Sequence, residues 1–117
     1  MKENVLLDKS FAFALCTVKA YKYLVEEKKE FVLSKQFLRS GTSIGANAEE
    51  STGGQSKADF LSKVSIAYKE ARETRYWIRL LNAANYLDDV QADSLLADVE
   101  ELLKIIGKIQ ITTKKQL

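Results

Sequence analysis

The chain has 117 residues, of which 46% are hydrophobic and 29% are charged, and its formal net charge at pH 7 is +2. This composition excludes a disordered chain, and the length predicts one domain over residues 1–117. Proline is absent, which favours helices. Histidine is also absent, which excludes catalytic triads, histidine bases and most zinc and iron sites. These absences remove several kinds of active site, and we expect no catalytic residues, metal or cofactor.

The first predicted helix covers about residues 6–28. Residues spaced by three and four positions form its predicted core seam, namely Leu7, Phe11, Ala14, Val18, Tyr21 and Val25. The only cysteine, Cys16, lies among apolar residues and is expected to be a small buried side chain. No apolar run is long enough to cross a bilayer, and no leader with a cleavage site is recognisable. The expectation is a cytoplasmic protein without a membrane partner.

The second predicted helix covers about residues 31–50 and contains the stretch RSGTSIGANAEES, Arg39 to Ser51. Its polar residues recur at helical spacing on one face, and Gly41 and Gly45 form a small-xxx-small pair beside them. Small residues let a neighbouring backbone come close. The stretch is therefore predicted to be helical, and the clearest break in the chain, STGGQS, begins only at Ser51.

A polar stripe inside a bundle needs partners on a facing helix. One interpretation of this stripe is a ligand-binding or catalytic site. The interpretation that we adopt is an interhelical hydrogen-bond network that fixes helix register. Its predicted members are Gln36, Arg39, Ser40, Ser43, Asn47 and Glu50 in the second helix, and Lys63, Lys69, Glu70 and Glu73 in the third. The glutamates have oxygen ligands to offer, but the basic neighbours and the lack of histidine argue against a metal site.

The third predicted helix covers about residues 57–85, with a capping pattern at Ser56. The fourth covers about residues 90–112, with Asp88 or Asp89 as its N-cap and fraying near Thr112. Four amphipathic helices with short connections predict an all-α, antiparallel up-down-up-down four-helix bundle. The third and fourth helices have wider apolar faces than a monomeric bundle needs. This surplus predicts a homo-oligomer.

The third predicted helix also carries Arg72, Arg75 and Arg79 on one stripe, with aromatic residues near it. Arginines beside aromatic rings suit phosphates and unstacked bases. Basic residues outnumber acidic ones in residues 57–87, and the reverse holds in residues 88–117. Two interpretations stay open: a nucleic-acid surface, or pairing of the basic helix with an acidic helix of a neighbouring subunit.

Two segments resemble a known family. SKQFLRSGTSIGANAEES (residues 34–51) and SKADFLSKVSIAYKEARETRYWIRLL (residues 56–81) are similar to the four-helix bundle proteins encoded by intervening sequences in bacterial 23S ribosomal RNA genes, also labelled S23 ribosomal proteins. The most specific elements are Gln36, Arg39-Ser40, Ser43-Ile44, Asn47, Glu50, Phe60, Lys69-Glu70 and Trp77. The family commonly has Asn-Ile-Ala-Glu-Gly where this chain has Asn47-Ala48-Glu49-Glu50-Ser51.

The resemblance implies a non-enzymatic bundle that assembles into a ring, with a homopentamer expected, and a link to nucleic acid. Related bundles look like the accessory proteins of diversity-generating retroelements, which bind a reverse transcriptase and nucleic acid through a basic ring surface. Two hypotheses follow. In the first, the oligomer binds RNA or DNA through Arg72, Arg75 and Arg79, with Lys19 and Lys22. In the second, the ring is a scaffold for a protein partner such as a polymerase.

Overall fold

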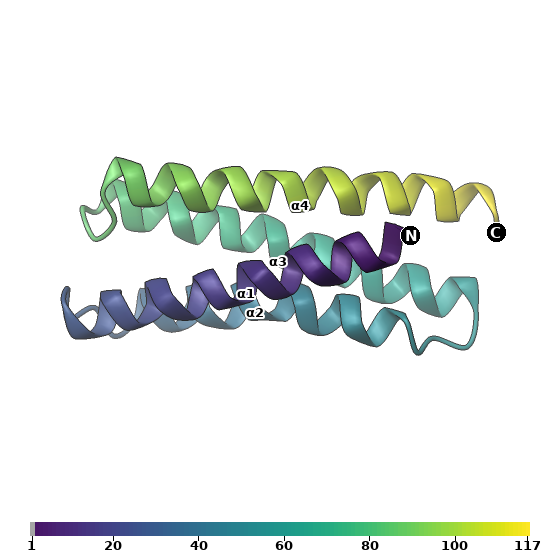
Figure 1. Cartoon of the computed structure of the whole chain (residues 1–117), viewed down its shortest axis with the longest axis horizontal. Coiled ribbons are helices and arrows are strands. Elements are labelled where there is room, and N and C mark those ends of the chain that lie inside the picture. The colour runs from purple at the N-terminus through teal and green to yellow at the C-terminus, as the bar shows by residue number, and fades with distance from the viewer. Residues whose placement is uncertain (1) are drawn as a thin grey trace.

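Four long helices make up the computed structural model, which describes the backbone of residues 2–117 and the side chains of residues 5–117. They are α1 (Lys2–Glu26), α2 (Leu33–Ser51), α3 (Lys57–Ala83) and α4 (Asp89–Lys115). Consecutive helices run in opposite directions, and residues 2–117 contain no strand (Figure 1). Each helix packs on its sequence neighbours, α4 also meets α1, and α1 and α3 lie on a diagonal. The predicted all-α fold with four helices is confirmed, and the helix directions are those of an up-down bundle.

The turn between α1 and α2 is longer than the sequence indicated, since it covers residues 27–32. Lys29 takes up a left-handed conformation there, with φ of 56°. The Glu30 carboxylate then accepts hydrogen bonds from the backbone amides of Val32, Leu33 and Ser34, at 3.1, 3.0 and 2.6 Å. Amides at the start of a helix lack carbonyl partners within it. Glu30 therefore starts α2 in place of a conventional N-cap side chain.

The starts of α3 and α4 follow the predicted capping chemistry. The Ser56 hydroxyl accepts a hydrogen bond from the Asp59 amide at 3.1 Å. At α4, Asp88 is the N-cap, and its side chain and that of Gln91 each accept a hydrogen bond from the other residue's amide. These bonds stop both helices from extending backward into their connecting turns.

The ends of α3 and α4 differ from the prediction. α3 ends at Ala83 because Asn85 has a left-handed φ of 68°, which an α-helix does not accommodate. α4 does not fray near Thr112 but extends to Lys115. Thr113 is buried there, and its hydroxyl donates to the Ile109 carbonyl at 2.7 Å, so the last turns pack against the bundle.

Apolar spacing predicts core seams in the third and fourth helices, namely Phe60, Val64, Ala67, Ala71, Thr74, Ile78 and Leu81 in α3, and Leu95, Val99, Leu102, Ile106 and Ile109 in α4. All of these side chains are buried except that of Phe60, which is half-buried. Apolar residues beside these seams, such as Tyr68, Trp77 and Leu96, are half-buried within the single chain. Much of the wide apolar surface of these two helices, from which we predicted a second interface, is therefore covered within one bundle. No helix in the described residues combines the length and apolarity of a membrane span.

The predicted core seam of α1 was wrong by about one residue. The buried positions are Leu6, Ser10, Phe13, Thr17 and Leu24, whereas Phe11 is 67% exposed. Cys16, which we expected to be buried, is exposed as well. Periodicity alone could not choose the buried face, because this part of α1 is apolar on every side.

The buried face of α1 is the one that packs against the two glycines of α2, Gly41 and Gly45. A Cβ at Gly41 would lie 2.7 Å from the Thr17 hydroxyl oxygen, and a Cβ at Gly45 would lie 3.3 Å from the Ser10 carbonyl oxygen. Distances this short show that α1 packs directly onto the glycine face of α2. The predicted role of the pair, close approach of a neighbouring helix, is confirmed.

Candidate nucleic-acid interface

The polar face of α2 points at α3, and Arg39 is its main contact. Its guanidinium pairs with Glu70 at 3.3 Å and with Glu73, so one cation bridges two carboxylates one turn apart. Glu73 also accepts a hydrogen bond from the Trp77 indole at 2.9 Å. Trp77 was not among the predicted network residues. Its spacing of four from Glu73 was the available signal, because such residues share a helix face.

A second contact is buried deeper in the same seam. The Thr74 hydroxyl lies 2.9 Å from the Ser40 hydroxyl, and both side chains are fully buried. The remaining hydrogen-bonding capacity is used locally, since the Ser40 hydroxyl also lies 3.3 Å from the Phe37 carbonyl. Buried hydroxyls matched across a seam disfavour helix slippage, because slippage would leave both groups unpaired. Thr74 was predicted as a core position and missed as a polar partner.

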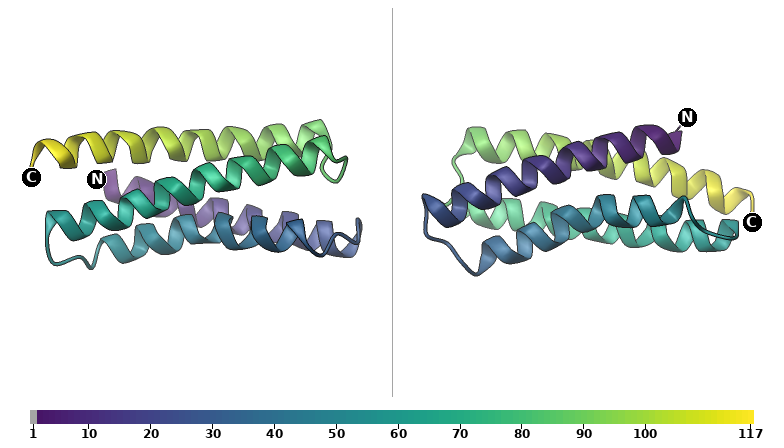
Figure 2. Two further views of the ribbon diagram at one scale, coloured as in Figure 1. Left: turned by 180° about the vertical axis from the view of Figure 1, so that it is seen from behind. Right: turned by 60° about the horizontal axis from the view of Figure 1, so that its bottom comes forward.

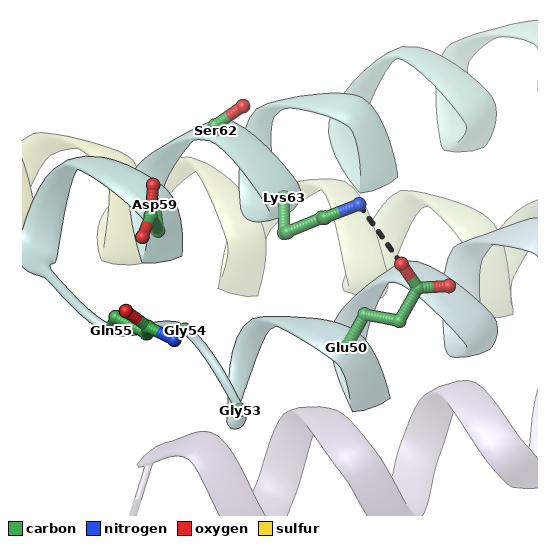
Figure 3. A pocket seen from close by; sticks show the side chains of 7 residues that line it. All are labelled: Glu50, Gly53, Gly54, Gln55, Asp59, Ser62 and Lys63. Atoms are coloured by element: carbon green, nitrogen blue, oxygen red, sulfur yellow. Dashed lines mark hydrogen bonds and ion pairs between the residues drawn. The ribbon is translucent and has the colours of Figure 1, made fainter.

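At the far end of α2, Glu50 pairs with Lys63 at 2.9 Å (Figure 3). This pair borders a hollow of about 400 Å³ under the α2–α3 turn, which Gly54 and Asp59 also line. Acidic and basic side chains mix around it, so it presents no field of one sign to a ligand. Within residues 5–117, no group of three or more acidic or cysteine side chains is placed to hold a metal ion.

Four predicted network residues do not bridge α2 and α3. The Ser43 hydroxyl donates to the Arg39 carbonyl at 2.6 Å, and the Asn47 amide donates to the Ser43 carbonyl at 2.8 Å, so both bond within α2. Gln36 and Lys69 are exposed. Short polar side chains in helices commonly bond to the carbonyl one turn back, which spacing alone does not reveal. The interhelical network is therefore smaller than predicted.

The arginine stripe of α3 divides into two parts. Arg75 leans toward α4 and pairs with Glu100 at 2.9 Å. Arg72 and Arg79 are exposed, and neither forms an ion pair with the side chains of residues 5–117. The pairing of a basic α3 with an acidic α4, which we considered between subunits, thus occurs inside one chain at Arg75.

Two further residues extend the outward part of the stripe. Lys69 is exposed one turn before Arg72, and the Tyr76 ring, 54% exposed, lies between Arg72 and Arg79 along the helix. Tyr76 meets the Trp77 ring edge to face, with centroids 5.0 Å apart, which supports the position of its ring. We name Lys69, Arg72, Tyr76 and Arg79 the α3 basic face.

Lys19 and Lys22 are not part of this face. Both are exposed on α1, which lies diagonally across the bundle from α3. Figure 1 shows α1 in front, whereas the view from behind in Figure 2 shows α3 in front. The five predicted nucleic-acid contacts are thus on two opposite faces of one chain, with Arg75 between helices.

Glu30 is a structurally important carboxylate that the sequence pattern did not reveal. Burial by itself raises the pKa of its carboxyl, but the amides of Leu33, Ser34 and Val32 and the Ser34 hydroxyl stabilise the charged form more strongly. The pKa of Glu30 is therefore held below its ordinary value. The spacing of Glu30 four residues before Ser34 was the available signal, although the charged run around it is typical of a solvated turn.

These features define a class: small four-helix bundles whose polar contacts serve helix pairing and whose charged faces point to solvent. A sequence model of the 23S rRNA-intervening sequence protein family matches residues 2–108. The chain belongs to this family, which confirms the resemblance seen in residues 34–51 and 56–81.

The solved structures include a protein of unknown function from the S23 ribosomal protein family of Bacteroides thetaiotaomicron VPI-5482. It is 52% identical to this chain with a TM-score of 0.93, and the alignment covers 94% of this chain and 98% of that one. A comparison with curated proteins found no match. The family and the fold are thus established, and the activity has to be argued from the surfaces.

Proposed function

We propose that this protein is a non-enzymatic, cytoplasmic homo-oligomer that binds RNA or DNA through the α3 basic face. The observation that carries the proposal is the contrast within one helix. Arg75 is engaged by Glu100, whereas Arg72 and Arg79 point to solvent without an acidic partner among residues 5–117. Charges that only join helices would be paired within the bundle, as Arg75 is.

The chemistry of the face fits a single-stranded or irregular nucleic acid. A guanidinium donates two parallel hydrogen bonds to phosphate oxygens, and the Tyr76 ring offers a surface on which an unstacked base can lie. The exposed side chains follow α3 at steps of three and four residues. The face is therefore a narrow track suited to a backbone that runs along the helix.

A single copy of this face is small, so affinity would come from repetition. An oligomer presents several α3 faces to one nucleic acid, and each later contact then forms at a high effective concentration. Five copies is the number that the family resemblance implies. RNA is the first ligand to test, because the family is described by its link to a 23S ribosomal RNA gene.

The test compares two single substitutions with a charge-matched control. Replacing either Arg72 or Arg79 with alanine should weaken binding of labelled single-stranded RNA. In each variant the slope of log affinity against log salt should fall in magnitude by about one for each phosphate that is no longer bound. The Arg75→Ala variant removes one charge of the same type, but from a residue that faces Glu100. It should bind RNA almost as well as the unaltered protein.

Equal losses of affinity in the single variants Arg72→Ala, Arg75→Ala and Arg79→Ala would show that only net charge matters, and would refute the α3 basic face. Absence of RNA and DNA binding at low salt would refute nucleic-acid binding as a whole. Light scattering decides the oligomer separately, because a mass of one chain would contradict it.

A second candidate function is a scaffold that holds a protein partner. It is favoured by apolar side chains at the end of the bundle where the 27–32 turn and the start of α4 lie. Phe31, Val32 and Val90 are 52%, 71% and 80% exposed there. A partner that survives nuclease treatment and no longer binds when Val32 becomes aspartate would support this function. Loss of every partner after nuclease treatment would refute the scaffold function, and the nucleic-acid proposal would be the one that remains.

A further inference from the structure

Three hollows lie in a row along the seam between α1 and α4. Their volumes are about 150, 140 and 280 Å³ from the N-terminal to the C-terminal part of α1. Each has apolar side chains from both helices, and these include Val5, Phe13, Tyr23, Leu95, Leu102 and Ile109. Val5 to Tyr23 corresponds to about 27 Å of helix. We name this row the α1–α4 groove.

The other three seams of the bundle are closed by close contacts. Glycines bring α2 onto α1, the Arg39 ion pairs join α2 to α3, and Arg75 joins α3 to Glu100 of α4. α1 and α4 contact each other less than any other neighbouring pair. Among the side chains of residues 5–117, one ion pair crosses their seam, Lys9 to Glu101 at 3.3 Å, with both side chains about half exposed.

A ridge of matching character lies on the outer side of α1. Residues 11–18, FAFALCTV, contain no charge, and in a helix their side chains point in all directions. Phe13 and Thr17 are buried, whereas Phe11 and Leu15 are 67% and 51% exposed. Positions two apart on a helix are about 200° apart, so Phe11 and Leu15 face away from the core. Together with half-buried Val18 they form the α1 ridge.

We infer that the α1 ridge of one copy of this chain occupies the α1–α4 groove of the next copy. The inference rests on the proposed homo-oligomer and assigns its interface. A helix with apolar residues all round is normally buried all round, and one chain leaves both sides of α1 uncovered. Ridge and groove are different surfaces of the same subunit, so the contact is heterologous and generates a ring when the rotation closes.

The charged residues that line the groove favour one direction for the ridge. Lys22 lies one turn beyond Val18, at the C-terminal end of the ridge. Asp98 lines the middle hollow, Lys108 lines the hollow beside the N-terminal part of α1, and Lys19 lines the remaining one. When the two copies point the same way along the ring axis, Lys22 of one copy lies on the side of Asp98 of the next. The opposite direction would bring it toward Lys108.

This arrangement leaves the α3 basic face accessible. α3 lies diagonally opposite α1 and contributes nothing to either ridge or groove. Every subunit of the ring would therefore present one such face, which is the repetition that the proposed nucleic-acid binding requires.

Native Cys16 makes the inference testable, since it is exposed in the groove and is the only cysteine of the chain. A second cysteine is placed on the ridge, as Phe11→Cys or Val18→Cys, and the protein is oxidised. Neither position can reach Cys16 in its own chain, because their side chains point to different sides of the helix. We expect a ladder of covalent species beyond the dimer that disappears when Cys16 is also changed to serine. The control is Ile111→Cys on α4, which is 59% exposed and outside both surfaces.

Light scattering supplies the second readout. Phe11→Asp should reduce the mass to that of one chain, and Ile111→Asp should not. Covalent dimers alone would overturn the heterologous contact. An oligomer that forms no Cys16-dependent cross-link with either ridge variant would overturn the assigned interface and leave the proposed oligomer intact. A mass of one chain for the unaltered protein would overturn both.

Discussion

The two sides of α1 are packed by opposite means. Toward α2, the missing side chains of Gly41 and Gly45 let the helices touch through Thr17 and the Ser10 backbone. Toward α4, the two helices make fewer contacts and hollows lie between them, one of which Tyr23 lines. The same helix thus has one seam that a single chain completes and one that it leaves open.

This difference separates residues that build the fold from residues that are available for partners. The polar, small-residue stretch of α2 is the most distinctive part of the sequence, yet its contacts with α1 and α3 are structural. The surfaces left over for function come from less distinctive sequence: the uncharged run of α1 and the outward residues of α3. Three substitutions test the contrast between the tight seam and the open seam.

The largest effect is expected from Gly41→Ala in the tight seam. Alanine in place of glycine normally stabilises a helix by up to about 1 kcal/mol. Here its Cβ would lie 2.7 Å from both Oγ1 and Cγ2 of the buried Thr17, so the seam must open. Overpacking of this kind costs about 1–3 kcal/mol. Urea denaturation should show a net loss of stability.

The matched control is Gly107→Ala in α4, where the nearest atom to the new Cβ is a Tyr68 ring carbon at 4.0 Å. This variant should be neutral or more stable. Combining Gly41→Ala with Thr17→Ala should restore most of the stability, because the atoms in conflict are gone. A stabilising Gly41→Ala in the unaltered background would show that the α1–α2 seam is loose, and that the two sides of α1 do not differ in this way.

A smaller effect is expected from Glu30→Gln at the turn that leads α1 into the tight seam. An amide replaces the carboxylate that bonds three backbone amides, so about 1 kcal/mol of stability should be lost at neutral pH. Because the folded pKa of Glu30 is lowered, its contribution is full above the unfolded pKa and is lost as pH falls through the folded pKa.

The measurement is the urea midpoint of both proteins from neutral to acid pH. The difference between the unaltered protein and Glu30→Gln should shrink as the pH falls, since protonated Glu30 then resembles glutamine. A difference that stays constant across this range would mean that the charge of Glu30 does not contribute to the start of α2.

The sequence predicted the fold well where apolar spacing was unambiguous. The seams of α3 and α4 have one apolar stripe each, so the period of 3.6 fixed their buried residues. It failed on α1, where residues 11–18 are apolar on all sides and the buried face was decided by glycines of another helix. The turn before α2 was misplaced for a related reason, because the cap comes from Glu30, outside the usual capping residues.

The site was predicted in part. Charge and spacing predicted which charged residues take part in the network, although not every pairing. The ion pairs between α2 and α3 are formed by five of the predicted members, namely Arg39, Glu50, Lys63, Glu70 and Glu73. Spacing could not tell that Ser43 and Asn47 bond within their own helix, or that Arg75 turns toward Glu100 while Arg72 and Arg79 do not. Those outcomes depend on a few tens of degrees of helix rotation, which only the packed bundle sets.

The smallest effect is expected from Lys9→Ala in the open seam, measured in the Phe11→Asp background so that association does not contribute. Lys9 forms the ion pair that crosses to α4, but it and Glu101 are 44% and 53% exposed. Exposed ion pairs contribute about 0–1 kcal/mol, so the urea midpoint should hardly move. A loss of stability as large as that of Gly41→Ala would mean that this ion pair holds α1 to α4, and that the groove is a closed part of the monomer. A negligible loss fits a seam that is left for another copy to fill.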